Sequence, residues 1–189
     1  MQMIPKLLYG AATTLLCAEL QAAPLPEHMQ VQLLPATGEP VTVAELTLKP
    51  LAEGGYEYSL AMNQVIFSDQ FLSMRPFKCL DAPQQMLCHL PYPYTKTSHI
   101  TGDDLRNLEY DLLFIHRKPS DYGIDPWNGV YYQLTLNEDE GKIEGDIRAV
   151  DLDILAAPPA AGDAYPITPD DLHETAAETH AFPRLVIQQ

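Results

Sequence analysis

Positively charged side chains are scarce in this chain. Its 189 residues include 11 lysines and arginines against 26 aspartates and glutamates, which gives a formal net charge of −15. Nucleic-acid binding depends on lysine and arginine side chains that neutralise phosphates, and anionic membrane surfaces attract cationic segments. The composition therefore argues against both nucleic acid and an anionic lipid surface as partners.

Long apolar runs are missing as well. The nearest approach is at the start, where Lys6 precedes a short apolar stretch and the small residues Ala22 and Ala23 offer a cleavage site. That stretch is shorter than the about 20 residues needed to span a bilayer. The pattern predicts a signal peptide over residues 1–22, export to the periplasm or out of the cell, and no membrane span. Lipidation of Cys17 is the alternative, although Leu16 stands where a small residue is expected.

Cysteine is rare, and removal of the leader leaves only Cys79 and Cys88. An even pair in an oxidising compartment is most simply a disulfide. The residues between them include Asp81, Pro83 and Gln84, which favour a turn. The sequence therefore predicts a Cys79–Cys88 bridge that pins a hairpin-like loop between two strands.

Alternation of apolar and polar residues, interrupted by turn residues, runs through most of the chain. Short strands at this spacing are typical of an all-β, mainly antiparallel domain, either a barrel or a sandwich, here over residues 23–155. The apolar residues switch from odd-numbered to even-numbered positions between Val43 and Ala44, and again between Ile147 and Val150. A strand keeps the same face buried through such a switch only if it contains an extra residue, so a β-bulge is predicted at each place. The expected strands cover residues 41–48, 56–62, 65–74, 86–92, 108–118, 130–136 and 143–155.

Helix signals are few. Residues 101–108 can form a turn or two before a strand. Thr168 and Pro169, followed by acidic residues, form a strong helix start, and Pro183 marks a stop. We therefore expect residues 156–189 to form a Pro/Ala linker and a short C-terminal helix, ending near His180 and packed on the same domain.

The tripeptide before the strand at residues 130–136 has a structural parallel. Trp127, Asn128 and Gly129 stand just ahead of an alternating strand, and this arrangement resembles lipocalin-like barrels in outline. The resemblance covers three residues and implies a single-domain barrel, without implying membership of that family. A lone tryptophan at such a position commonly plugs one mouth of a barrel, so packing is the structural interpretation of Trp127.

Cationic, aromatic and proline residues gather beside the predicted disulfide. Residues 75–118 carry six basic and five acidic side chains, whereas residues 119–189 carry three and fourteen. An apolar pocket with a few convergent polar groups is the usual form of a ligand site. Alternatively, the disulfide staples a long loop, the tyrosines cover core edges and His116 is a hydrogen-bonded core residue. The predicted ligand-binding residues are Arg75, His89, Tyr92, Tyr94, His116 and Trp127.

Recognisable catalytic and metal-binding motifs are missing. The chain has no Gly-x-Ser-x-Gly elbow and no glycine-rich phosphate loop. His173 and His180 are too far apart on a helix for one metal ion, and residues 137–141 lack the spacing of a calcium loop, so they read as a hairpin turn. The sequence predicts no catalytic residues, no metal and no cofactor.

These observations together predict an exported, monomeric, non-enzymatic binding protein. Its partner would be a small amphiphilic or anionic ligand, or a protein of the cell envelope. Two alternatives stay open. One is a hydrolase of cell-envelope material that uses histidine and acidic residues. The other is an acidic inhibitor or interaction protein that faces a basic envelope enzyme.

Overall fold

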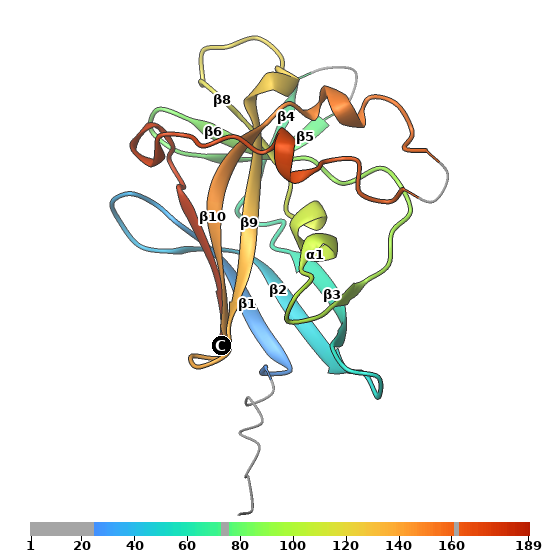
Figure 1. Cartoon of the computed structure of the whole chain (residues 1–189). Coiled ribbons are helices and arrows are strands. Elements are labelled where there is room, and N and C mark those ends of the chain that lie inside the picture. Colours follow the sequence, from blue (N-terminus) through green and yellow to red (C-terminus); the bar gives the residue numbers. More distant parts are fainter. Residues whose placement is uncertain (1–24, 73–75, 161–162) are drawn as a thin grey trace, which may run out of the picture.

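An antiparallel β-sheet of 11 strands dominates the structure, a computed structural model that describes residues 25–72, 76–160 and 163–189 (Figure 1). The strand order is β4-β5-β6-β8-β9-β10-β11-β1-β2-β3-β7, so β4 and β7 are its edges and the sheet is not closed in the described part of the chain. The prediction of a mainly antiparallel β protein is confirmed. The strands are β1 (His28–Leu34), β2 (Val41–Pro50), β3 (Tyr56–Met62), β4 (Ser68–Phe71), β5 (Pro76–Asp81), β6 (Met86–His89), β7 (His99–Ile100), β8 (Phe114–Arg117), β9 (Gly129–Asn137), β10 (Lys142–Val150) and β11 (Arg184–Gln188).

The last strand in the sequence lies in the middle of the sheet. β11 pairs with β10 on one side and with β1 on the other. Alternation puts Met29, Val31 and Leu33 of β1 into the core, next to Leu185 and Ile187 of β11. Neither β1 nor β11 is among the predicted strands. Together they join β2, β3 and β7 to the rest of the sheet.

Both faces of the sheet around β10 are covered. Ile143 and Ile147 belong to the main core, which lies between β1–β3 and β9–β10, whereas Val150 belongs to a second core on the other face. The pairing of β10 with β9 is continuous from Lys142 to Val150. The predicted bulge between Ile147 and Val150 is therefore wrong, because the change in parity reflects burial on two faces instead of an extra residue.

The bulge predicted near Val43 is confirmed. Val31 of β1 pairs with Ala44 and the next residue, Gln32, pairs with Thr42, so Val43 is the extra residue. Val43 and Ala44 are both fully buried. The extra residue lets two consecutive apolar side chains enter the core, which a regular strand does not allow.

The expected C-terminal helix is wrong. Thr168 and Asp171 form a capping box at the expected helix start, but only a single 3₁₀ turn follows, Pro169–Asp171, and a second one stands at Ala177–Thr179. Between them His173 makes a two-way backbone bridge with Ala149. This segment covers the second core with Ile167 and Leu172, and an extended chain spreads those side chains along the sheet. Burial has overridden helix propensity here.

The strand expected over residues 108–118 is half wrong. Its first part forms the helix α1 (Arg106–Asp111), which lies between β9 and β3 in Figure 1, and only Phe114–Arg117 forms a strand, β8. Leu108 of α1 packs in the main core and Tyr110 in the second. The helix therefore occupies the boundary between the two cores.

The predicted disulfide is present. Cys79 of β5 and Cys88 of β6 are direct cross-strand partners with an S–S distance of 2.05 Å. The turn between them is closed by a hydrogen bond from the Ala82 backbone N–H to the Gln85 carbonyl oxygen, 3.0 Å. The bridge thus holds the hairpin whose tip borders the site described below.

The predicted signal peptide at residues 1–22 lies outside the described residues. Within the part of the chain that the structure describes, none of the helices has the length and apolar character needed to cross a lipid bilayer.

Candidate functional site

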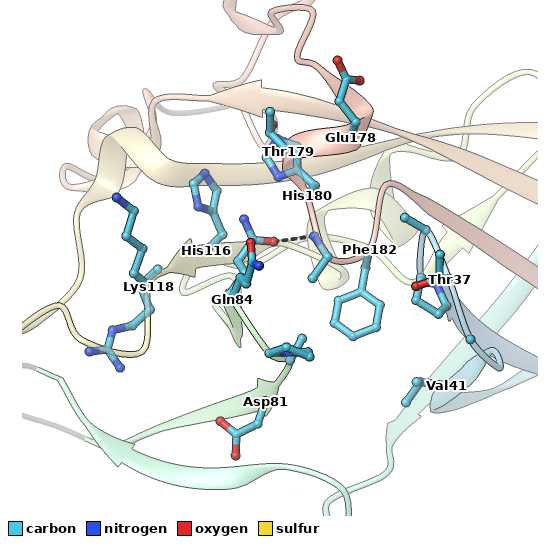
Figure 2. A pocket seen from close by; sticks show the side chains of 18 of the residues that line it. Thr37, Val41, Asp81, Gln84, His116, Lys118, Glu178, Thr179, His180 and Phe182 are labelled. Carbon is cyan, nitrogen blue, oxygen red and sulfur yellow. Dashed lines mark hydrogen bonds between the residues drawn. The ribbon is translucent and has the colours of Figure 1, made fainter.

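A cleft of about 960 Å³ opens at one end of the sheet. Most of its lining comes from four segments far apart in the sequence: the β1–β2 loop, the β5–β6 turn, the end of β8 with the loop after it, and the C-terminal segment before β11. Figure 2 shows Lys118 and His116 on one side, Thr37 and Val41 on the other, and Phe182 between them. Gln85 ties two of these segments together, because its Oε1 accepts a hydrogen bond of 2.9 Å from the Ala181 backbone N–H.

Two imidazoles meet in the wall of this cleft. The rings of His116 and His180 lie edge to face with their centroids 5.1 Å apart. His180 is buried, and its Nε2 is 2.8 Å from the Thr175 hydroxyl. Its Nδ1 has no hydrogen-bond partner among the described residues. Burial lowers the pKa of both histidines, and the neighbouring His180 lowers that of His116 further. Both rings are therefore neutral at pH 7.

Two adjacent cations line the same cleft, and in the described part of the chain neither forms an ion pair. The buried guanidinium of Arg117 donates only to neutral acceptors, the Met86 sulfur at 3.1 Å and the Asp121 carbonyl oxygen. Lys118 is exposed and lines the same cleft. Every other lysine and arginine that the structure describes has a carboxylate within 4.0 Å. In a protein with this excess of acid, two unpaired cations at one cleft form a distinct electrostatic feature.

The remaining lining is divided between apolar and acidic groups. Val41, Ala82 and Phe182 give the cleft an apolar wall. Four carboxylates, from Glu39, Asp81, Asp121 and Glu178, also line it, but all four residues are exposed to solvent. Two are engaged by the protein itself: Asp81 accepts from the Ser68 hydroxyl at 3.3 Å, and Asp121 accepts from the Lys118 backbone N–H at 3.1 Å. The four acidic residues thus form a solvent-exposed rim around the apolar wall and the two cations.

The two predicted histidines occupy different surroundings. His116 lines the cleft, whereas His89 is not among the lining residues. Nε2 of His89 is instead 3.0 Å from the Asp111 carbonyl oxygen, and its ring packs against Phe114. Burial lowers the pKa of His89. Arg75, which is also among the predicted ligand-binding residues, lies outside the described residues.

The two predicted tyrosines lie on the second core. The Tyr92 hydroxyl donates to the Ala164 carbonyl oxygen at 2.8 Å, and the Tyr94 hydroxyl donates to the Leu155 carbonyl oxygen at 2.9 Å. The Tyr92 ring packs edge to face on Tyr110. These contacts hold the C-terminal segment against the sheet, away from the residues that line the cleft.

Trp127 does not plug the end of a barrel. It sits in the 3₁₀ turn Pro126–Asn128, is 71 % exposed, and donates its backbone N–H to the Asp125 carboxylate at 3.1 Å. The packing interpretation of Trp127 is therefore wrong. The cap formed by Asp125 fixes a tight turn that directs the indole into solvent.

Several lining residues escaped the sequence analysis. No sequence motif marks Arg117, Lys118 or Gln85. The sequence pattern presents His180 only as a possible zinc ligand on an expected helix. The two cations differ from the other described lysines and arginines because neither forms an ion pair. That difference arises only when the chain is folded. The low density of acid in residues 75–118 was the one available signal, and both cations fall in that range.

The neutral imidazole pair predicts that stability falls in mild acid. A histidine whose pKa is lower in the folded than in the unfolded chain binds fewer protons when folded, so stability is lost as pH falls from the ordinary value of about 6.5 through the lowered one. We expect the urea midpoint to be lower at pH 5 than at pH 7.5. Carboxylates elsewhere in the protein contribute to the pH dependence as well. The test is therefore a comparison with the His116→Gln/His180→Gln variant, whose pH dependence should be shallower. Equal slopes would contradict the prediction.

The described residues contain no group of three or more His, Cys, Asp or Glu side chains arranged to hold a metal ion. His116 and His180 are thus a pair without a third such partner. No protein-family model matches the chain, and no curated protein and no solved structure is significantly similar to it.

Proposed function

We propose that this protein is an exported binding protein whose cleft holds a small amphiphilic anion, such as a carboxylate attached to an apolar chain. The observation that carries the proposal is the pair of cations, Arg117 and Lys118, which have no ion-pair partner in the described chain and border the same cleft. A buried charge is costly unless it is compensated, and an anionic ligand would compensate it. The apolar wall of Val41 and Phe182 would accept the rest of the molecule.

The size and chemistry of the cleft fit this role. Its volume lies within the range of about 300–1,000 Å³ that is usual for small-molecule sites. The neutral rings of His116 and His180 can donate or accept hydrogen bonds without adding charge. The Cys79–Cys88 disulfide is compatible with a compartment outside the reducing cytosol, which supports the export part of the proposal.

A hydrolase is the less favoured alternative. The Thr175 hydroxyl and His180 Nε2 lie 2.8 Å apart, which is the distance of a nucleophile and its base. A base of this kind is normally oriented by a third group on its other nitrogen. Nδ1 of His180 lacks such a partner among the described residues. Binding without chemistry therefore agrees better with the geometry.

Calorimetric titration with decanoate, decanol and inorganic phosphate tests the proposal. We expect decanoate to bind more tightly than decanol because only decanoate carries a charge for Lys118 and Arg117. Lys118→Gln alters an exposed residue and should weaken decanoate binding by about tenfold, the equivalent of one charge-assisted hydrogen bond. Lys49→Gln, at an exposed pair elsewhere, is the matched control and should have no effect. Equal binding of decanoate and decanol, or no binding of decanoate, would overturn the proposal.

A further inference from the structure

A second, smaller hollow lies away from the cleft, on the face of the second core. It has a volume of about 200 Å³ and is walled by residues from five segments, among them Leu90, Pro93, Ile124, Pro126 and Leu155. Small-molecule pockets are usually larger than about 300 Å³. A hollow of this size suits a single bulky apolar side chain that belongs to a larger partner.

The walls of this hollow are fixed by the protein's own hydrogen bonds. The tyrosines on either side of Pro93 are tied to the C-terminal segment, Tyr92 to the Ala164 carbonyl oxygen and Tyr94 to the Leu155 carbonyl oxygen. The opposite wall follows the 3₁₀ turn Leu152–Leu155, which Asp151 caps. A preformed surface loses less conformational entropy when a partner binds.

Exposed apolar side chains continue from the hollow onto the surface. Trp127 follows Pro126 directly and is 71 % exposed, and Ile154, in the turn that forms the opposite wall, is 36 % exposed. Farther along, the backbone at Gly123 approaches Leu72, which brings the exposed Tyr122 and Phe71 into the same region. Tryptophan and tyrosine are the residues most enriched at the centres of protein interfaces.

The charge around the hollow is negative. Asp153 is the one charged residue among the described residues of its lining, and Asp125 and Asp151 cap the two turns beside it. No lysine or arginine of the described chain belongs to that lining. Complementarity therefore requires cationic groups on the partner, which excludes anionic lipid surfaces and acidic proteins.

We propose that this surface, the hollow together with Trp127, docks a peptide segment of another protein that carries a bulky apolar anchor flanked by lysine or arginine. The anchor enters the hollow, the indole of Trp127 packs over it, and Asp153 faces the flanking cations. This interaction is separate from ligand binding in the cleft. A cationic partner protein would thus bind the acidic surface of this protein at one defined place.

Trp127 is the single tryptophan of the chain, so its fluorescence reports directly on this surface. The probe is a short peptide with a central Leu-Phe-Leu flanked by lysines. One comparison peptide replaces its lysines by glutamates, and another replaces its apolar residues by serines. We expect a blue shift of Trp127 emission with the first peptide alone, and weaker binding at high salt. Equal binding of the glutamate or the serine peptide would overturn the proposal, as would a blue shift with neutral lipid vesicles but not with the peptide.

Two exposed positions allow variants that leave the core intact. Ala156→Arg places bulk and positive charge in the lining of the hollow and should abolish peptide binding, whereas Ala156→Ser should preserve it. Asp153→Asn should weaken binding about threefold, and Asp139→Asn, in the distant β9–β10 hairpin, should not. The affinity of these variants for decanoate should not change, and this measurement distinguishes the hollow from the cleft. Undiminished peptide binding by Ala156→Arg would refute the proposal.

Discussion

Gly129→Ala should destabilise the protein by about 3 kcal/mol or more. The added Cβ would lie 2.6 Å from the Leu152 side-chain Cγ and would overlap still more strongly with the Val150 carbonyl oxygen. Gly129 pairs with Val150 in β10 and with Ile115 in β8, so the backbone on both sides is fixed by the sheet. Overpacking in a core typically costs about 1–3 kcal/mol, and a clash with backbone lies at the upper end because a carbonyl cannot change rotamer.

The measurement is the free energy of unfolding from urea titration. Gly102→Ala is the matched control, since the nearest atom to its new Cβ is 3.5 Å away, an ordinary contact. That variant should be neutral or slightly more stable, because alanine reduces the entropy of the unfolded chain. A Gly129→Ala protein as stable as the Gly102→Ala protein would contradict the prediction.

Lys96→Met should cost about 2–3 kcal/mol of unfolding free energy. The Lys96 ammonium, 8 % exposed, lies 2.7 Å from the Asp111 carboxylate and 2.9 Å from the Tyr58 hydroxyl, which donates to that carboxylate at 2.6 Å. Breaking a buried pair typically costs about 3–5 kcal/mol because one charge is left uncompensated. The figure here is lower, since the Asp111 side chain is 29 % exposed and water can partly hydrate it. Burial and the adjacent carboxylate also raise the pKa of Tyr58, so its hydroxyl keeps its proton and remains a donor.

A double-mutant cycle separates the lost charge pairing from lost packing. Lys96→Met leaves the Asp111 carboxylate without its counter-charge, and Asp111→Asn removes that carboxylate. The loss of unfolding free energy in the double variant should therefore be smaller than the sum of the losses in the two single variants. Lys49→Met is the surface control. Its ion pair with Glu57 spans 3.9 Å between side chains that are 78 % and 52 % exposed, and its loss should be nearly neutral. Strict additivity in the Lys96/Asp111 cycle would show that the pair contributes nothing.

Local patterns were sufficient for the parts of the fold that local physics determines. The Cys79–Cys88 bridge followed from compartment and cysteine count, and the bulge at Val43 from two consecutive apolar residues in an alternating strand. The hairpin at residues 137–141 joins β9 to β10 as its turn residues indicated. In each case the deciding contacts join two strands that follow one another directly in the sequence.

The errors arose where distant segments decide the outcome. The change from odd- to even-numbered apolar positions at Val150 indicates a bulge only if one face of the sheet is exposed to solvent. Here Leu152, Leu155 and Ile167 cover that face. The same covering role extends the chain at His173, where a helix was expected, because its backbone pairs with Ala149. β1 is not among the predicted strands although Met29, Val31 and Leu33 alternate with polar residues, and its partner β11 lies at the far end of the sequence.

The candidate site was only partly predictable for a related reason. Its histidine pair joins β8 to a segment more than sixty residues later, and the distinguishing property of Arg117 and Lys118 is a missing neighbour. Residue types can be read from a sequence, whereas the absence of a counter-charge cannot. His116 was identified because a polar residue on an apolar strand is visible locally.

The central position of β11 governs when this sheet can be completed. β1, β2, β3 and β7 form one ladder and β4, β5, β6, β8, β9 and β10 form another, and β11 is the strand that pairs with both. Until residues 184–188 are in place, β1 and β10 each present an unpaired edge of backbone donors and acceptors, which is the kind of surface on which chains aggregate. During synthesis the two ladders therefore cannot join until β11 is available, and their edges stay open for longer than in a chain whose neighbouring strands pair in order.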